Sequence, residues 1–197
     1  MIDKIMNIEY EATFIDINKD EIREKLAKVG ASLVKKEFLQ KRTVFNLPKG
    51  NNIDGGWLRV RDEGDRITMS FKVVNGNQIQ NQKEIQLIVD NYQEARKFLI
   101  SIGCREKAYQ ESKRELWRLN NVDIAIDEWP FLEPFVEVEG RSEKEVKRIS
   151  EKIGFDYSQA KFCAVDTLYH EKYQVSLDKI DYNTPKILFE MKNPFQA

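Results

Sequence analysis

Three segments of the chain carry apolar residues at helical spacing between a capping residue and a glycine. They span residues 18–30, 91–103 and 142–154, and each has Glu three positions after its capping residue. That spacing is typical of a capping box, and glycine suits a left-handed C-terminal cap. The apolar stripes consist of Ile22, Leu26 and Val29, then Ala95, Phe98, Leu99 and Ile102, then Val146, Ile149 and Ile153. The pattern predicts three amphipathic helices, each packing one face on a sheet.

The first two helical segments belong to a longer repeat. Glu11 lies 19 residues before Gly30, and Glu84 lies 19 residues before Gly103. This spacing indicates two related halves, each with an acidic strand, then a helix, then further strands. We find no stretch rich in Pro, Gly or Ser between them, so we expect the halves to share one core.

Apolar and polar residues alternate in the segments between the helices, which is typical of strands. Arg59 and Arg61 share one face of segment 57–61, and Lys72 lies on the polar face of segment 67–73. Segment 110–119 places Ser112 and Arg114 on one face, and segment 122–127 does the same with Asp123 and Asp127. Three helices are available to cover the apolar faces. We therefore predict an α+β fold, a closed or nearly closed antiparallel β-barrel with a charged lumen and helices outside.

Two pairs of glutamates, far apart in the sequence, each lie within a strand pattern. Glu9 and Glu11 form one pair, and Glu137 and Glu139 the other. Side chains two residues apart in a strand point to the same face, so two such pairs in one cavity would suit a hard divalent cation such as Mg²⁺ or Mn²⁺. For either pair alone, a solvated sheet face is the simpler interpretation. The basic residues on the strands between them favour a shared site.

A lumen with both signs of charge needs a polar ligand, because an isolated buried charge is costly. Cations on some strands would hold phosphate oxygens, and carboxylates on others would hold a metal that screens the remaining charge. This combination predicts a metal–polyphosphate ligand.

Composition sets wider limits. With 197 residues, 41% apolar and 33% charged, we expect a single domain over residues 1–197. The net charge of −1 provides no bulk attraction to nucleic acid or to an anionic membrane. The chain has no apolar run of transmembrane length and no signal-peptide pattern at its start. Cys104 and Cys163 lack metal-ligand spacing, and His170 is the single histidine. We expect a cytoplasmic protein, monomeric or homodimeric, without nucleic-acid or membrane partners.

With these features the sequence resembles the CYTH superfamily, the triphosphate tunnel enzymes. This superfamily includes class IV adenylate cyclases, thiamine triphosphatases and inorganic triphosphatases. The resemblance covers roughly residues 8–155. The matching positions are Glu9 and Glu11 in the opening acidic strand, Arg59 and Arg61 in WLRVRDEG, Lys72, Glu84, Arg114, Asp127, and Glu137 and Glu139 in FVEVE. Their order and same-face spacing carry the resemblance. Two positions depart from it: Thr13 replaces a lysine, and Ser112 replaces a frequent basic residue. Lys41 or Arg42 would supply replacement charge, or lie at a surface edge.

The resemblance implies a metal-dependent enzyme acting on ATP, tripolyphosphate or thiamine triphosphate. The implied phosphate-binding residues are Arg59, Arg61, Lys72 and Arg114, with Arg42 as a further candidate; the implied metal ligands are Glu9, Glu11, Glu137, Glu139 and Glu84; and Lys72, Arg114 and Asp127 are the catalytic candidates. In a triphosphatase, water attacks the terminal phosphorus, whereas in a cyclase the ribose 3′-hydroxyl attacks the α-phosphorus. A non-catalytic polyphosphate-binding module is the alternative. The aromatic segment 156–197 either covers the barrel, which we favour, or walls the tunnel.

Overall fold

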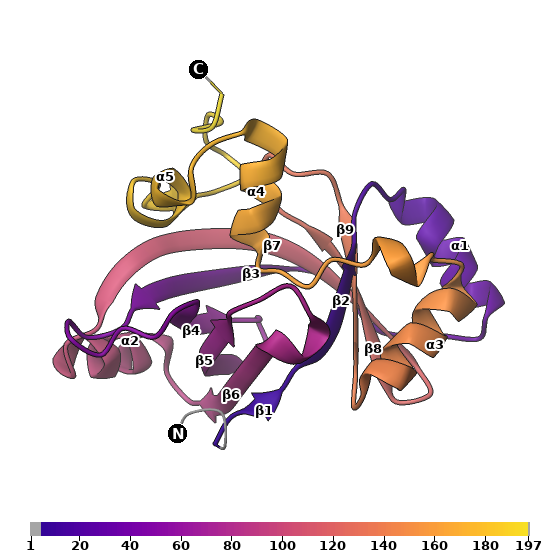
Figure 1. Cartoon of the computed structure of the whole chain (residues 1–197), viewed down its shortest axis with the longest axis horizontal. Coiled ribbons are helices and arrows are strands. Elements are labelled where there is room, and N and C mark those ends of the chain that lie inside the picture. The colour runs from indigo at the N-terminus through magenta and orange to yellow at the C-terminus, as the bar shows by residue number, and fades with distance from the viewer. Residues whose placement is uncertain (1–4, 197) are drawn as a thin grey trace.

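A single curved sheet forms the centre of the molecule, and helices lie outside it (Figure 1). This computed structural model describes residues 5–196, with the side chains of residues 181 and 182 excepted. Helices α1 and α3 lie side by side against one part of the sheet, while α2 lies at the opposite end and α4 and α5 cover a third side (Figure 1).

The main sheet runs in the order β1-β6-β5-β4-β3-β7-β8-β9-β2, and every neighbouring pair along it is antiparallel. Its strands are β1 (Asn7–Ile8), β2 (Tyr10–Phe14), β3 (Ser32–Asn46), β4 (Gly56–Asp62), β5 (Ile67–Val74), β6 (Gln82–Val89), β7 (Arg105–Leu119), β8 (Val122–Glu128) and β9 (Phe135–Gly140). The predicted strands are therefore present, and the fold is the expected α+β barrel.

The N-terminal segment nearly closes the barrel by changing its partner at Glu9. Before this residue β1 pairs with β6, and after it β2 pairs with β9. The Glu9 backbone N–H donates to the Gln82 carbonyl at 2.9 Å, and the Gln82 side-chain amide donates to the Glu11 carbonyl at 2.7 Å. One short segment thus joins the two edges of the sheet, and its acidic residues lie at the seam.

The two halves of the chain exchange their first strands. Each half has the same order, β2-α1-β3-β4-β5 and β6-α2-β7-β8-β9, in which β3 and β7 are both 15 residues long. The opening strand β2 pairs with β9 of the second half, and β6 pairs with β5 of the first. Strands β3 and β7 pair with each other along the middle. The repeat seen in the sequence therefore corresponds to two interlocked units.

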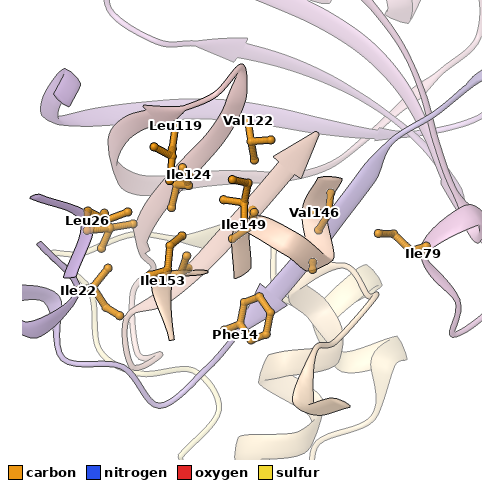
Figure 2. Packing of buried hydrophobic residues seen from close by; sticks show 14 residues of the cluster. Phe14, Ile22, Leu26, Ile79, Leu119, Val122, Ile124, Val146, Ile149 and Ile153 are labelled. Atoms are coloured by element: carbon orange, nitrogen blue, oxygen red, sulfur yellow. The ribbon is translucent and has the colours of Figure 1, made fainter. Parts of the chain in front are cut away.

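Helices α1 (Lys19–Lys28), α2 (Tyr92–Ser101) and α3 (Glu143–Ile153) begin at the predicted caps, where the side chains of Asn18, Asn91 and Ser142 accept backbone N–H groups. Figure 2 shows the largest apolar cluster, in which α1 and α3 pack on the outer face of β2, β8 and β9. The predicted stripe on α2 is wrong at Phe98 and Ile102, which are 55% and 51% exposed. Helix α2 buries only Ala95 and Leu99, because it contacts the sheet along a narrow line over β4 and β7.

The C-terminal segment contains η3 (Tyr157–Gln159), α4 (Val165–Tyr173), α5 (Leu177–Tyr182) and β10 (Lys186–Ile187). Strand β10 adds parallel to β7 at Tyr109 and Gln110, beyond the point where β8 stops pairing. A second apolar cluster holds this segment on the barrel and consists of Trp129, Phe135, Leu168, Tyr169, Ile180, Ile187 and Phe195. Among the described residues, no helix is long and apolar enough to cross a membrane.

Candidate active site in the barrel lumen

The lumen of the barrel contains a cavity of about 660 Å³, and about half of the residues in its wall are charged. Alternation along the strands produces this wall, because apolar residues such as Val60, Ile124 and Val138 point outward into the cores. The cavity lining includes every predicted metal ligand and every predicted phosphate-binding residue: Glu9, Glu11, Arg42, Arg59, Arg61, Lys72, Glu84, Arg114, Glu137 and Glu139. Asp127 is fully buried directly behind Arg114.

Three of the predicted metal ligands converge. Carboxylate oxygens of Glu9, Glu11 and Glu139 lie within 4.8 Å of one another. Glu11 and Glu139 face each other on β2 and β9, whereas Glu9 lies at the seam. Loss of hydration in the lumen raises the pKa of all three carboxyls, including that of Glu139, which is the exposed member of the three; repulsion from Glu9 adds to the rise at Glu139, whose pKa reaches about 7. Three clustered carboxylates with raised pKa values form a set of hard oxygen donors that a divalent cation would stabilise.

The other two predicted ligands pair with arginines and lie outside this cluster. Glu137 binds Arg114, which also holds Asp127 at 2.6 Å. Glu84 lies 3.2 Å from Arg59. Burial alone would raise the pKa of Glu84, but Lys72 and Arg59 outweigh it and lower the pKa to about 2. These two carboxylates are therefore adjacent to the acidic trio of Glu9, Glu11 and Glu139 without belonging to it.

Four of the predicted phosphate-binding cations are paired with carboxylates. The pairs are Lys72–Glu9 at 2.7 Å, Arg59–Glu84 at 3.2 Å, Arg61–Glu63 at 2.5 Å and Arg114–Asp127 at 2.6 Å. Burial alone would lower the pKa of Lys72, but Glu9 and Glu84 outweigh it and raise the pKa. Burial and repulsion from Arg59 lower the pKa of Arg61 to about 10. The carboxylates of the lumen thus partly neutralise these four cations.

Arg42 differs from these four. It is 5% exposed on β3, a central strand rather than an edge, and Lys41 beside it points outward. Its guanidinium donates to Gln40 Oε1 at 2.9 Å and to Ser112 Oγ, which are both neutral. Its guanidinium carbon lies 4.3 Å from the centre of the Trp129 ring. Arg42, rather than Lys41, therefore brings extra positive charge to the lumen.

The two departures from the family pattern have different surroundings. Ser112 is fully buried and accepts the Arg42 hydrogen bond, so a cation from β3 lies where β7 lacks one. Thr13 is 3% exposed, and its backbone pairs in both directions with Lys161 of the C-terminal segment. The space beside Thr13 is thus bounded by a segment far along the chain.

The C-terminal segment also forms part of the cavity wall. Its lining residues are Cys163, Ala164, Val165, Asp166, Tyr169 and Ile180. The Tyr169 hydroxyl donates to the Pro130 carbonyl at 2.7 Å, which ties α4 to the loop that carries Trp129. The segment therefore both covers the barrel and bounds the lumen on one side.

Sequence reasoning missed several residues of the site. Gln40 and Glu63 are nearly fully buried and line the cavity, and Glu63 contacts Arg61 and Arg66. Their positions two residues from Arg42 and from Arg61 were a usable signal, because same-face residues recur every second position. The C-terminal lining residues carried no such signal, since they follow no strand pattern.

Comparison with known proteins is consistent with this geometry. The CYTH domain model matches residues 7–169, which is most of the chain. The chain belongs to the CYTH family. A protein of Methanocaldococcus jannaschii named "Putative adenylate cyclase MJ0240" is 26% identical over 147 residues, covering 74% of this chain and 81% of that protein. The CYTH domain match ends within α4, so the last part of the C-terminal segment lies outside it.

Solved structures share the CYTH fold. A "putative adenylate cyclase" from Vibrio parahaemolyticus superposes with a TM-score of 0.72 at 10% identity, covering 82% of this chain and 97% of that one. A "Putative adenylyl cyclase" from Hippeastrum, described as having a dominant triphosphatase activity, has a TM-score of 0.59 at 13% identity, with coverage of 86% and 99%. At such identities the likeness concerns the fold alone.

Proposed function

We propose that this CYTH protein is a metal-dependent enzyme acting on a triphosphate, by hydrolysis or by cyclisation of ATP. The observation that carries the proposal is the position of the acidic trio beside a set of buried cations in one cavity. Lys72 connects the two groups. Its ammonium contacts Glu9 of the trio. Lys72 also lies opposite Glu84 on the neighbouring strand, and Glu84 contacts Arg59.

The donor set fits Mg²⁺ or Mn²⁺. Glu9, Glu11 and Glu139 offer carboxylate oxygens and no nitrogen or sulfur donors, which is the preference of hard divalent cations. Glu137 and Glu84 are further candidates that would first have to leave Arg114 and Arg59. A bound cation would neutralise phosphate charge and orient the leaving group.

The basic residues would grip the phosphate chain. We assign Arg59, Arg61, Arg114 and Arg42 to this role, since forked guanidinium groups match phosphate oxygens, and we add Lys72, whose ammonium acts as a point charge. Lys72 and Arg114 would also stabilise charge that develops as the phosphorus–oxygen bond breaks. Asp127 would act as a positioning residue, because both of its oxygens hold Arg114.

Hydrolysis and cyclisation differ in the attacking oxygen. The fold is shared with a protein named a putative adenylate cyclase and with another putative cyclase that is described as having a dominant triphosphatase activity. The test uses purified protein with Mg²⁺ or Mn²⁺ and, in turn, ATP, tripolyphosphate and thiamine triphosphate. Phosphate, pyrophosphate and cyclic AMP are measured in the same reactions. Phosphate release indicates a triphosphatase, and equal amounts of pyrophosphate and cyclic AMP indicate a cyclase. Binding without any product would contradict the proposal and indicate a polyphosphate-binding module.

The matched variants are Glu11→Gln in the trio and Glu24→Gln on the exposed face of α1. Loss of metal-dependent turnover in the first alone would assign the activity to this site. Equal activity in both variants would place it elsewhere, including in a contaminating phosphatase.

A further inference from the structure

Strand β6 has one edge that is only partly paired. Its other edge pairs with β5 over the whole strand, from Gln82 to Val89, whereas β1 pairs with Lys83 and Glu84 alone. Among residues 5–196, no strand pairs with segment 85–89 on the β1 side. Such an edge presents backbone N–H and C=O groups to which another strand can bind.

The free backbone groups belong to Gln86 and Ile88. In an antiparallel ladder the N–H and C=O of one residue point to the same neighbouring strand, and successive residues alternate. The Gln82 carbonyl accepts the Glu9 N–H, so the backbone groups of Gln82 point to the N-terminal side. Alternation places those of Gln86 and Ile88 on this side as well. Both residues are exposed, which leaves their backbone groups open to a partner strand.

Segment 85–89 has none of the features that usually protect a strand edge. Its sequence is Ile-Gln-Leu-Ile-Val, without charge or proline, and its ladder with β5 contains no bulge. Lysine, proline and bulges are the common means of preventing edge-to-edge association. Leu87 is 53% exposed on the outward face, and Ile88 is 73% exposed on the face that includes Gln86. The edge is therefore apolar on both faces and free to pair.

The exposed apolar surface continues from β6 onto α2. Leu87 lies opposite Met69 of β5, and Phe98 of α2 is 55% exposed. Arg96 contacts Glu106 of β7. Phe98 follows Arg96 by two residues, so on a helix with about 3.6 residues per turn it points to the opposite flank. Because α2 lies over β4 and β7, this flank faces β5 and β6.

We propose that two copies of this chain associate through the free edge of β6, with the two β6 strands antiparallel and related by a two-fold axis at Leu87. Gln86 of each copy then lies opposite Ile88 of the other, and each such pair exchanges both backbone hydrogen bonds. Leu87 meets Leu87 on the outward face, and Ile85 lies opposite Val89. The pairing is independent of any activity in the lumen.

The length of the free edge fits a second copy of the same strand. The edge begins after Glu84, the last residue that β1 pairs, and β6 ends at Val89, just before the cap of α2. Leu87 is the middle residue of this edge, so a two-fold axis there pairs the whole edge and brings no charged residues opposite each other. Self-complementary interfaces of this kind are common in homodimers. Since Gln86 lines the cavity, Ile88 of the second copy lies at the cavity margin.

The test measures the mass of the protein by sedimentation over a wide range of protein concentration. Leu87→Lys and Ile88→Pro are compared with the parent and with Ile100→Lys. Ile100 is 49% exposed on the flank of α2 opposite Phe98 and serves as the matched control. We expect Leu87→Lys to weaken dimerisation by about tenfold or more, because it places two lysines opposite each other and removes buried apolar area. Ile88→Pro should do the same, since it removes an N–H of the free edge and none of those bonded to β5.

Hydrogen exchange gives a second measurement at the edge itself. In the parent, the amides of Gln86 and Ile88 should exchange more slowly as the protein concentration rises, and in Leu87→Lys they should not. Ile100→Lys should behave as the parent does in both measurements.

A parent protein that stays monomeric at every concentration would overturn the pairing, as would a dimer that Leu87→Lys leaves as stable as Ile100→Lys does. Slow exchange of both amides in a monomer would also overturn it, because the chain would then cover its own edge. Circular dichroism checks folding, and if Ile88→Pro does not fold, Leu87→Lys decides. A dimer without turnover would support this interface while refuting the proposed enzyme, and an active monomer would do the reverse.

Discussion

The Lys72 ammonium lies 2.7 Å from the carboxylate of Glu9, the residue at the seam that closes the barrel. Glu9 belongs to the acidic trio and Lys72 to the proposed phosphate-binding set. Glu9, a proposed metal ligand, and Lys72, a proposed phosphate-binding residue, therefore form an ion pair with each other. A bound metal–phosphate ligand would offer each of them a new partner of opposite charge, the metal for Glu9 and a phosphate for Lys72.

Removing one carboxylate of the trio should weaken metal binding. We expect Glu11→Gln to lower the affinity for Mn²⁺ and raise the metal concentration needed for turnover, because an amide oxygen is a weaker ligand than a carboxylate. The fold should be retained, since neutralising a buried carboxyl whose pKa is raised removes a charge that burial disfavours. Calorimetric Mn²⁺ titration measures the effect, and unaltered affinity would exclude Glu11 as a ligand.

Proton competition should make metal binding depend on pH. Glu139 has a pKa of about 7, so it is largely protonated below that pH and must lose its proton to act as a ligand. Mn²⁺ affinity should therefore increase from pH 6 to pH 8 with release of protons. Titrations in two buffers of different ionisation enthalpy count the protons released. Glu139→Gln should reduce that number, and a pH-independent affinity would contradict the prediction.

Truncating Arg61 should weaken the grip on phosphate. Arg61→Ala should lower tripolyphosphate affinity by roughly ten- to a hundredfold, since a charge-assisted contact contributes about 1.5–3 kcal/mol. Arg66→Ala is a suitable control, because Arg66 also binds Glu63 but is half exposed at the mouth of the cavity. A loss of the same size in both variants would indicate general electrostatic attraction rather than a specific contact.

Bulk added to the C-terminal wall should select between ligands. Val165 at the start of α4 is half-buried and lines the cavity. We expect Val165→Trp to lower kcat/KM for ATP more than for tripolyphosphate, because a nucleoside needs more room than phosphate alone. Leu177→Trp alters an exposed residue of the same segment and serves as the control. Equal loss with both substrates would show that this wall does not contact the organic group.

Alternation along the strands made much of the lumen predictable. Whether Arg59 and Arg61 share a face depends only on the alternation of side chains along one strand, which is local information, and the same alternation places Lys72 on the polar face of its own strand. The burial of Arg42 was not predictable in this way, because it depends on β3 lying between β4 and β7 rather than at an edge. The ion pairs of Glu137 with Arg114 and of Glu84 with Arg59 likewise depend on how distant strands align. Pairing register and the path of residues 161–180 are tertiary features that no short pattern specifies.

The exchange of opening strands between the halves has a consequence for synthesis on the ribosome. Strand β2 finds its partner only after β9 has emerged, more than 120 residues later. Until then Glu9 and Glu11 remain apart from Glu139, and the nascent chain has no assembled trio. The proposed metal site would thus be complete only when most of the polypeptide has been made, and a chain truncated before residue 135 would present its acidic N-terminal segment without its partner strand β9.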